Sequence, residues 1–239
     1  MLNFEDFKKM ALSKNLKTYE KVGFTQVHRK DSEKNIFPDI LLKLNIKNKK
    51  VNIMDIGCGC SKPVFDLIKY CKKNGNNLYL VDSKEMLSNL PDEKFITKIE
   101  CEFPNCKQIN ELKGKIDYII IYSVLHHVVT HGNYVSFLDT AVELVKYGGR
   151  LLLADLPNVT KKKRFLSSCI GKEFHKKWAN TEINPEVDWN ELDKHSLDDS
   201  LIFSILQRYR NMGCETYLLE QMEGLSMNNS REDILIRRN

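Results

Sequence analysis

The chain has 239 residues, of which 42% are hydrophobic and 29% are charged, with only 11 Gly and 6 Pro. This composition excludes collagen-like, low-complexity and fully disordered chains, and the length fits one large domain or a domain with a substantial insertion. No apolar run approaches the roughly 18 residues that a membrane-spanning helix needs. Because the N-terminal stretch is acidic where a signal peptide would be basic and then apolar, we expect a soluble, cytoplasmic protein.

The cysteines argue against a disulfide framework. There are seven of them, an odd number, scattered at positions 58, 60, 71, 101, 106, 169 and 214, and we expect free thiols. Cys58 and Cys60 are one residue too close together for a zinc knuckle, and the sequence has no second pair of ligands to complete such a site. We therefore expect no zinc site.

Apolar runs that alternate with amphipathic stretches predict an α/β domain with a mainly parallel sheet. Strands are expected at residues 51–56, 78–81, 95–99, 116–124 and 150–154, and helices at 62–74, 84–90 and 134–147. A helix at 197–212 and strands at 214–220 and 233–237 follow. Residues 1–50 are predicted to form a helical extension, made of one amphipathic helix and a polar stretch, ahead of a domain at 51–239. Residues 157–197 show no clear period and are predicted to be an insertion after the fifth strand.

Basic residues gather in that insertion. Residues 161–177 hold seven Lys and Arg side chains against one acid, Glu173, a net charge of +6 in a chain that carries +5 overall. Because a nucleic-acid-binding protein usually has a wider basic face, this cluster suits a small anionic ligand better. The alternative is a solvated helix face in a lysine-rich protein.

The most informative element is the sequence Asp-Ile-Gly-Cys-Gly-Cys-Ser at residues 55–61, between a predicted strand and a predicted helix. Gly57 and Gly59 allow a sharp turn and the close approach of a ligand. Lys62 stands where a dinucleotide-binding loop has its third glycine. Asp55 instead suits a ligand with an ammonium or sulfonium group. Asp82, at the end of the next strand, suits ribose hydroxyls, or alternatively caps the following helix.

The glycine loop at residues 55–61, together with Val81-Asp82 and the stretch at 116–127, resembles the ordered motifs of class I S-adenosylmethionine (SAM)-dependent methyltransferases. The resemblance covers residues 51–155 and implies a doubly wound, Rossmann-like sheet of seven strands with an antiparallel last pair. It implies SAM as cofactor and S-adenosylhomocysteine (SAH) as product. Ser61 replaces the family's third loop glycine, and its usual aspartate after the third strand is absent. The implied cofactor site is Asp55, Gly57, Cys58 and Gly59 at the methionine end, Asp82 at the ribose, Ser83 and Met86 beside the adenosine, Cys101 and Glu102 at the adenine, and Ser123 along the cofactor.

Two histidines follow the fourth strand and are the candidate catalytic residues. A neutral imidazole at His127 or His126 suits removal of a proton from an attacking hydroxyl. Alternatively they are walls of the pocket, or they only orient an acceptor oxygen that is already ionised. His131 completes a possible metal cluster with them, but no carboxylate lies nearby in sequence, so we expect no metal.

The acceptor is predicted to be a small anionic molecule methylated on oxygen or carbon. The sequence lacks the Asn/Asp-Pro-Pro-Tyr-like motif that amino-methylating families carry after the fourth strand. The insertion lies where this fold often binds its acceptor, and the extension, with Tyr19, His28 and Arg29, is expected to cap the cofactor or to close the core. The candidate acceptor-binding residues are Lys162, Lys163, Arg164 and Lys172, with Trp178 or Trp189 packing over a ring.

The segment at residues 231–237, together with the glycine loop, resembles methyltransferases of bacterial surface-polysaccharide pathways, some of which decorate capsules with sugar or phosphoramidate groups. An O-methyltransferase acting on a carbohydrate, phosphoramidate or nucleotide-linked acceptor is therefore the leading hypothesis. The alternatives are an RNA or protein methyltransferase, which the basic segment favours, and a non-catalytic subunit that keeps the fold. Intact Asp55, Gly57, Gly59 and Asp82 argue against the last.

Overall fold

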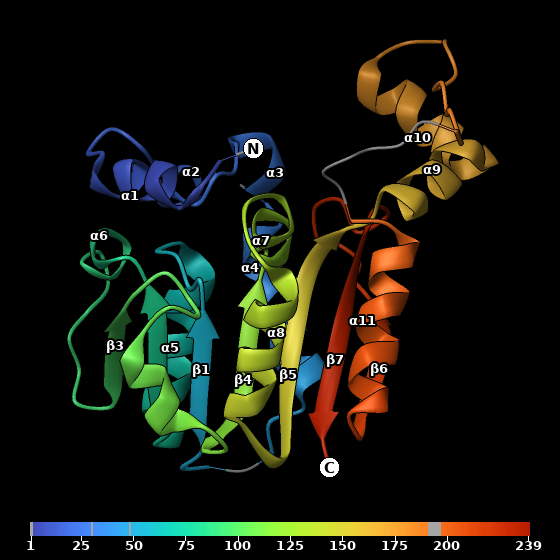
Figure 1. The fold of residues 1–239 in the computed structure, drawn as a ribbon. Helices are drawn as coiled ribbons and strands as arrows, with labels where there is room; N and C mark the ends of the chain where they lie inside the picture. Colours follow the sequence, from blue (N-terminus) through green and yellow to red (C-terminus); the bar gives the residue numbers. More distant parts are fainter. Residues whose placement is uncertain (1, 30, 48, 191–196) are drawn as a thin grey trace.

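The computed structural model describes residues 2–29, 31–47, 49–190 and 197–239, and its centre is a seven-stranded sheet (Figure 1). The strand order is β3-β2-β1-β4-β5-β7-β6, and only β7 runs antiparallel to its neighbours, β5 and β6. This topology confirms the predicted doubly wound sheet with an antiparallel last pair. The strands are β1 (Asn52–Ile56), β2 (Asn77–Asp82), β3 (Ile96–Glu100), β4 (Ile116–Tyr122), β5 (Val145–Pro157), β6 (Cys214–Glu220) and β7 (Arg231–Arg238).

Helices cover both faces of the sheet and create two cores. Consecutive β1 residues point to opposite faces, so that Ile53 belongs to one core and Met54 to the other. Helices α4 (Glu33–Leu44) and α5 (Lys62–Asn74) pack on the first face, and α8 (Tyr134–Leu144) and α11 (Asp199–Asn211) on the second. Since both faces are covered, the central strands are apolar on both sides, which explains the continuous apolar run in β4.

Helix α5 begins and ends at the predicted residues, because its sequence carries signals at both ends. Ser61 precedes it in an extended conformation, and Pro63 occupies the first turn, where a missing N–H costs little. At the other end Gly75 adopts φ +66°, and its N–H bonds to the carbonyl of Cys71. The helix thereby starts at the glycine loop after β1.

The N-terminal extension is helical, as predicted, but holds more helices than the single one expected. Helices α1 (Phe4–Leu12), α2 (Thr18–Lys21) and α3 (Gln26–Arg29) lie across the carboxyl ends of the parallel strands, ahead of α4 (Figure 1). The Lys21 ammonium donates to the carbonyl of Ala11 and to the Asn89 side chain, both at 2.9 Å. Asn89 follows α6 (Lys84–Leu87), so these bonds fasten the extension over the sheet.

The basic insertion contains two helices, α9 (Val159–Ser167) and α10 (Cys169–Ala179), which project from the body beyond β5 (Figure 1). We call residues 159–179 the arm. No residue of α9 is buried, and Gly171 is the buried residue of α10. Helix α10 nevertheless carries an apolar period that the prediction missed, because its exposed residues Ile170, Phe174 and Trp178 lie four positions apart. Residues 191–196 of the predicted insertion lie outside the described residues.

Several boundaries differ from the prediction. Helix α8 ends at Leu144 rather than residue 147, because Val145 already pairs with Ile116 of β4 and begins a longer β5. A short helix, α7 (Leu125–His131), follows β4, and a 3-10 helix, η1 (Lys107–Leu112), precedes it; neither was predicted from the sequence. Among the described residues no helix is long and apolar enough to cross a membrane.

Candidate active site

The loop after β1 turns at two glycines in the left-handed region, Gly57 at φ +72° and Gly59 at φ +60°. A Cβ on Gly57 would lie 2.5 Å from Cγ2 of Val124, and one on Gly59 would lie 2.6 Å from Cγ1 of Val22. Both separations are shorter than real contacts allow. The backbone angle and the neighbouring side chains therefore both require glycine here.

Two carboxylates flank this loop at the ends of the adjacent strands β1 and β2. Asp82 accepts hydrogen bonds from the N–H groups of Gly59 at 2.9 Å and Ser83 at 2.7 Å, so it holds the loop in place. The cap of α6 is Ser83 rather than Asp82, since the Ser83 hydroxyl accepts from the Met86 N–H at 3.2 Å. Asp55 is 7% exposed, and its carboxylate accepts no hydrogen bond from the rest of the described chain.

Burial sets the charge of both acids. It raises the pKa of Asp55, and together with the negative charge of Asp82 it brings this pKa to about 8. Burial also raises the pKa of Asp82 to about 6, against the effect of the two N–H donors, which stabilise its ionised form. A cation placed against Asp55 would stabilise its ionised form against both the burial and the repulsion by Asp82. The site is therefore electrostatically suited to a positively charged ligand.

A cavity of about 350 Å³ opens beside the loop, within the usual range of about 300–1,000 Å³ for small-molecule sites. Most of the residues that we predicted to bind the cofactor or to act in catalysis line this cavity. Ser83 and His126 are not among the described residues that line it. The predicted residues that do line it are Asp55, Gly57, Cys58, Gly59, Asp82, Met86, Cys101, Glu102, Ser123 and His127.

The N-terminal extension supplies one wall of this cavity. Phe7, Val22, Phe24 and Arg29 line it, whereas Tyr19 is not among the described lining residues and the side chain of His28 lies outside the described residues. The sequence reasoning identified Arg29 but missed the three apolar residues. The available signal for Phe7 was its spacing of three residues from Phe4, which places both rings on one face of α1.

The turn from β4 into α7 places Ser123 and the histidines. Ser123 has φ +60°, uncommon for a residue other than glycine, and its buried hydroxyl has no hydrogen-bond partner among the described residues. The Nδ1 of His127 lies 3.1 Å from the carbonyl oxygen of Leu2. Because a carbonyl only accepts, Nδ1 carries the proton, and Nε2 is left as an acceptor.

Both histidines are neutral at physiological pH. Burial lowers the pKa of His127 to about 4, against the effect of its bond to Leu2, and lowers the pKa of His126 to about 2. The two rings lie 4.0 Å apart between centroids, and the edge of Phe7 packs against His127 at 5.0 Å. His127 can thus accept a hydrogen bond inside the cavity, but it holds a proton poorly.

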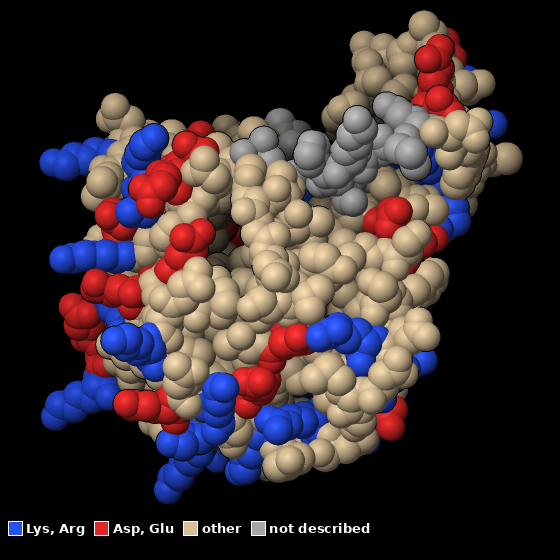
Figure 2. All heavy atoms as spheres, viewed as in Figure 1, with Lys and Arg blue, Asp and Glu red and all other residues tan. Residues whose placement is uncertain are grey.

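The arm lies apart from this cavity. Lys162, Lys163, Arg164, Lys172 and Trp178 are all absent from the described lining residues. Arg164 forms an ion pair with Asp199 of α11, which anchors the arm to the body, and Trp178 is 69% exposed. Figure 2 shows acidic as well as basic side chains on the part of the molecule that projects at the upper right. A role for these residues in acceptor binding stays a prediction.

The segment after β3 contains a disulfide, which corrects the expectation that all seven cysteines are free. Cys101 pairs with Cys106, while the other five are free thiols. The segment from Cys101 to Asn105 lines the cavity, with Phe103 and Pro104 as apolar wall residues that the sequence reasoning missed. Pairing within so short a segment leaves no signal in an odd, scattered cysteine count.

Comparison with known proteins supports this geometry. Residues 54–151 match the family model described as a methyltransferase domain. A search of curated proteins finds no match to the sequence. Among solved structures, a complex between the Trm112 methyltransferase activator of Haloferax volcanii and a methyltransferase matches with TM-score 0.60 at 10% identity, covering 100% of both chains.

Two further solved structures show the same fold. A SAM-dependent methyltransferase from Aquifex aeolicus matches with TM-score 0.53 at 14% identity, covering 88% of this chain and 96% of its own. The N-methyltransferase NodS from Bradyrhizobium japonicum, in complex with SAH, matches with TM-score 0.55 at 12% identity, covering 98% and 97%.

Sheet order, glycine loop and acid pair together define the fold of class I SAM-dependent methyltransferases. With the methyltransferase domain at residues 54–151, the protein is a methyltransferase that uses SAM as its methyl donor.

The residues present fit this cofactor. Asp55 is a buried carboxylate without a hydrogen-bond donor from the described chain, which matches the ammonium and sulfonium charges of SAM. A Cβ would fill the space at Gly57 and Gly59, so the backbone itself forms the cradle. When bound, SAM supplies an electrophilic methyl group, and the chain's task is to bind the acceptor, orient it and exclude water.

Proposed function

We propose that the protein transfers the methyl group of SAM to an oxygen atom of a small, anionic acceptor. The observation that carries this proposal is the walled cavity. Phe7, Val22 and Phe24 of the extension close it on one side, which leaves space for a metabolite rather than for a folded macromolecule. A carbohydrate, phosphoramidate or nucleotide-linked acceptor of bacterial surface-polysaccharide synthesis fits this description, and the resemblance of residues 231–237 supports that class.

The proposed catalytic role of the histidines follows from their charge. Neutral His127 offers its Nε2 to an acceptor hydroxyl and orients it, and its low pKa makes it a weak proton acceptor. This favours an acceptor oxygen that is ionised before transfer, because such an oxygen needs no base. The ring of His126 lies 4.0 Å from that of His127 between centroids, at an angle of 40°, and is proposed to hold it in position.

The test is transfer of radiolabelled methyl from SAM into an extract of surface-polysaccharide precursors. We expect label in the small-molecule fraction that binds an anion-exchange column. The matched control is Asp55→Asn, which keeps the shape of the side chain but removes its charge, and it should abolish transfer and weaken SAM binding. Label confined to the macromolecular fraction would overturn the proposal.

A second candidate is an RNA or protein methyltransferase. The Haloferax volcanii structure pairs its methyltransferase with Trm112, and the arm of this chain carries seven basic residues. Tight, salt-sensitive binding of structured RNA in a gel-shift titration would favour this candidate over the small acceptor.

A further inference from the structure

Arg29, the last residue of α3, is a buried cation in the wall of the cavity. It is 6% exposed and lines the cavity together with Phe24 and Tyr122. Its guanidinium lies 3.7 Å from the centroid of the Phe24 ring and 5.5 Å from that of Tyr122. These rings leave the charge little water and fix the plane of the group. A buried cation is costly unless acceptors meet its N–H groups.

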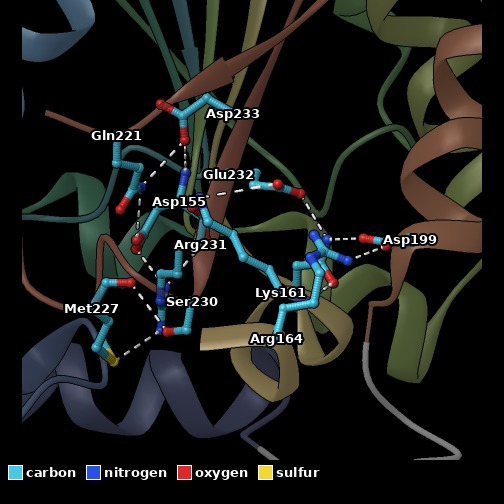
Figure 3. A network of polar contacts seen from close by, with 11 residues as sticks. Asp155, Lys161, Arg164, Asp199, Gln221, Met227, Ser230, Arg231, Glu232 and Asp233 are labelled. Atoms are coloured by element: carbon cyan, nitrogen blue, oxygen red, sulfur yellow. Dashed lines mark hydrogen bonds and ion pairs between the residues drawn. The ribbon is translucent and has the colours of Figure 1, made fainter. Parts of the chain in front are cut away.

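The described residues place a carboxylate near those N–H groups but accept no hydrogen bond from them. The nearest carboxylate is that of Asp155, 3.9 Å from Nη2 of Arg29, which is too long for a direct hydrogen bond. Asp155 instead accepts hydrogen bonds from Arg231, at 2.7 Å, and from Gln221, at 3.3 Å (Figure 3). No hydrogen bond joins the guanidinium to another residue in the described part of the chain. Arg29 therefore keeps donors for an external acceptor.

Its position separates it from the cofactor end of the cavity. Tyr122 and Asp155 lie at the ends of β4 and β5, whereas Asp82 ends β2 on the other side of β1. Strands β2 and β5 are three spacings apart, about 14 Å at the usual spacing between neighbouring strands. A ligand that runs from Asp82 past Asp55 thus leaves the space over β4 and β5 for the acceptor.

We propose that Arg29 binds the oxyanion of the acceptor, a phosphate or a carboxylate, inside the cavity beside Phe24 and Tyr122. This inference rests on the proposed function and deepens it, because it locates the anion site in the N-terminal extension rather than in the arm. The planar guanidinium offers a paired set of donors that matches either group.

The chemistry of transfer agrees with this site. An ionised acceptor oxygen forms a bond to the methyl carbon as the carbon–sulfur bond breaks, and the sulfur keeps that electron pair. The acceptor loses one negative charge, and no proton is transferred. The weak basicity of His126 and His127 is then no obstacle.

The test measures binding, not turnover. Phenyl phosphate is titrated into SAH-saturated protein and followed by 31P NMR, with wild type, Arg29→Met and Arg29→Lys. Wild type should bind the probe saturably, Arg29→Met at least about tenfold more weakly, and Arg29→Lys in between, because it keeps the charge but loses the paired donors. The matched control is Arg238→Met, since Arg238 also lies over a ring, Tyr147 at 4.6 Å, but belongs to the end of β7. It should bind the probe like wild type.

Three results would overturn the inference. If wild type shows no saturable binding, or if Arg29→Met binds the probe like wild type, Arg29 is no anion site. If Arg29→Met weakens SAH but not 5′-methylthioadenosine, which lacks the amino-acid group, Arg29 holds the carboxylate of the cofactor instead. Failure of wild type to bind SAH at all would be a failure of the proposed function and is detected first. Unchanged thermal melting of Arg29→Met would show that the variant is folded.

Discussion

A methyl group added at Gly57 tests how tightly the loop is built. In Gly57→Ala the new Cβ would lie 2.5 Å from Cγ2 of Val124, a β-branched side chain that cannot easily turn away, and the backbone would stay at φ +72°. The left-handed conformation costs roughly 1–2 kcal/mol for a residue with a Cβ. Overpacking adds about 1–3 kcal/mol. We therefore expect a loss of about 2–5 kcal/mol in the free energy of unfolding.

The chain offers a control that separates these two terms. Gly114 has nearly the same backbone angle, φ +68°, but a Cβ there would meet nothing within 4 Å. In Gly114→Ala the free energy of unfolding should therefore fall only by the cost of the left-handed backbone. Adding Val124→Ala to Gly57→Ala should restore most of the stability that overpacking removes, although the smaller side chain leaves a small cavity of its own.

Urea denaturation of the cofactor-free variants measures these free energies, and calorimetric titration with SAH measures the site. Gly57→Ala should bind SAH at least about tenfold more weakly, because the loop must move to relieve the contact. Equal destabilisation in Gly57→Ala and Gly114→Ala, with unchanged SAH affinity, would refute the reasoning. The loop would then be too loose to position a cofactor.

Three further predictions concern charge. The pKa of Asp55 in the folded, cofactor-free protein is about 8, above its ordinary value of 3.8. Between these two values the folded state binds a proton that the unfolded state does not, so stability should fall as the pH rises from about 4 to about 8. In urea denaturation, Asp55→Asn should flatten this slope. SAM binds the ionised form, so its affinity, measured by calorimetry, should rise over the upper part of that range, and a pH-independent affinity would contradict this. His127, with a pKa of about 4, should stay neutral from pH 5.5 to 8 in an NMR titration, and His127→Ala should lower turnover less than tenfold; a loss of a hundredfold or more would identify it as a general base. Because the arm lies apart from the cavity, Lys162→Ala should leave the KM values of both the acceptor and SAM unchanged in steady-state kinetics, and a rise in the KM of the acceptor alone would show that the arm contributes to the acceptor site.

The glycine loop and the sheet were predictable because their sequence signals are local. Asp55 and Gly57 are two residues apart, at the end of β1 and in the loop after it, and helix α5 carries its own start and stop signals at Pro63 and Gly75. Two parallel strands in register then bring Asp82 to the same edge. Each of these steps needs only residues that are near in sequence or on neighbouring strands.

The acceptor side of the cavity was not predictable in the same way. Arg29 and Phe24 belong to an extension whose position depends on long-range bonds, such as that between Lys21 and Asn89, which no local pattern encodes. The pairing of Asp155 with Arg231 joins residues 76 positions apart. The two helices of the arm were missed for another reason. The apolar side chains of α10, Ile170, Phe174 and Trp178, lie four positions apart, but they are exposed and stand among basic residues.

The most direct test of the account is a crystal structure of the protein with SAH. The account predicts that the amino group of SAH lies within about 3 Å of the Asp55 carboxylate and that the ribose hydroxyls bond to Asp82, with the adenine near Cys101 and Phe103. SAH bound elsewhere, or a cavity filled by the protein's own side chains with Asp55 out of reach of the ligand, would contradict it.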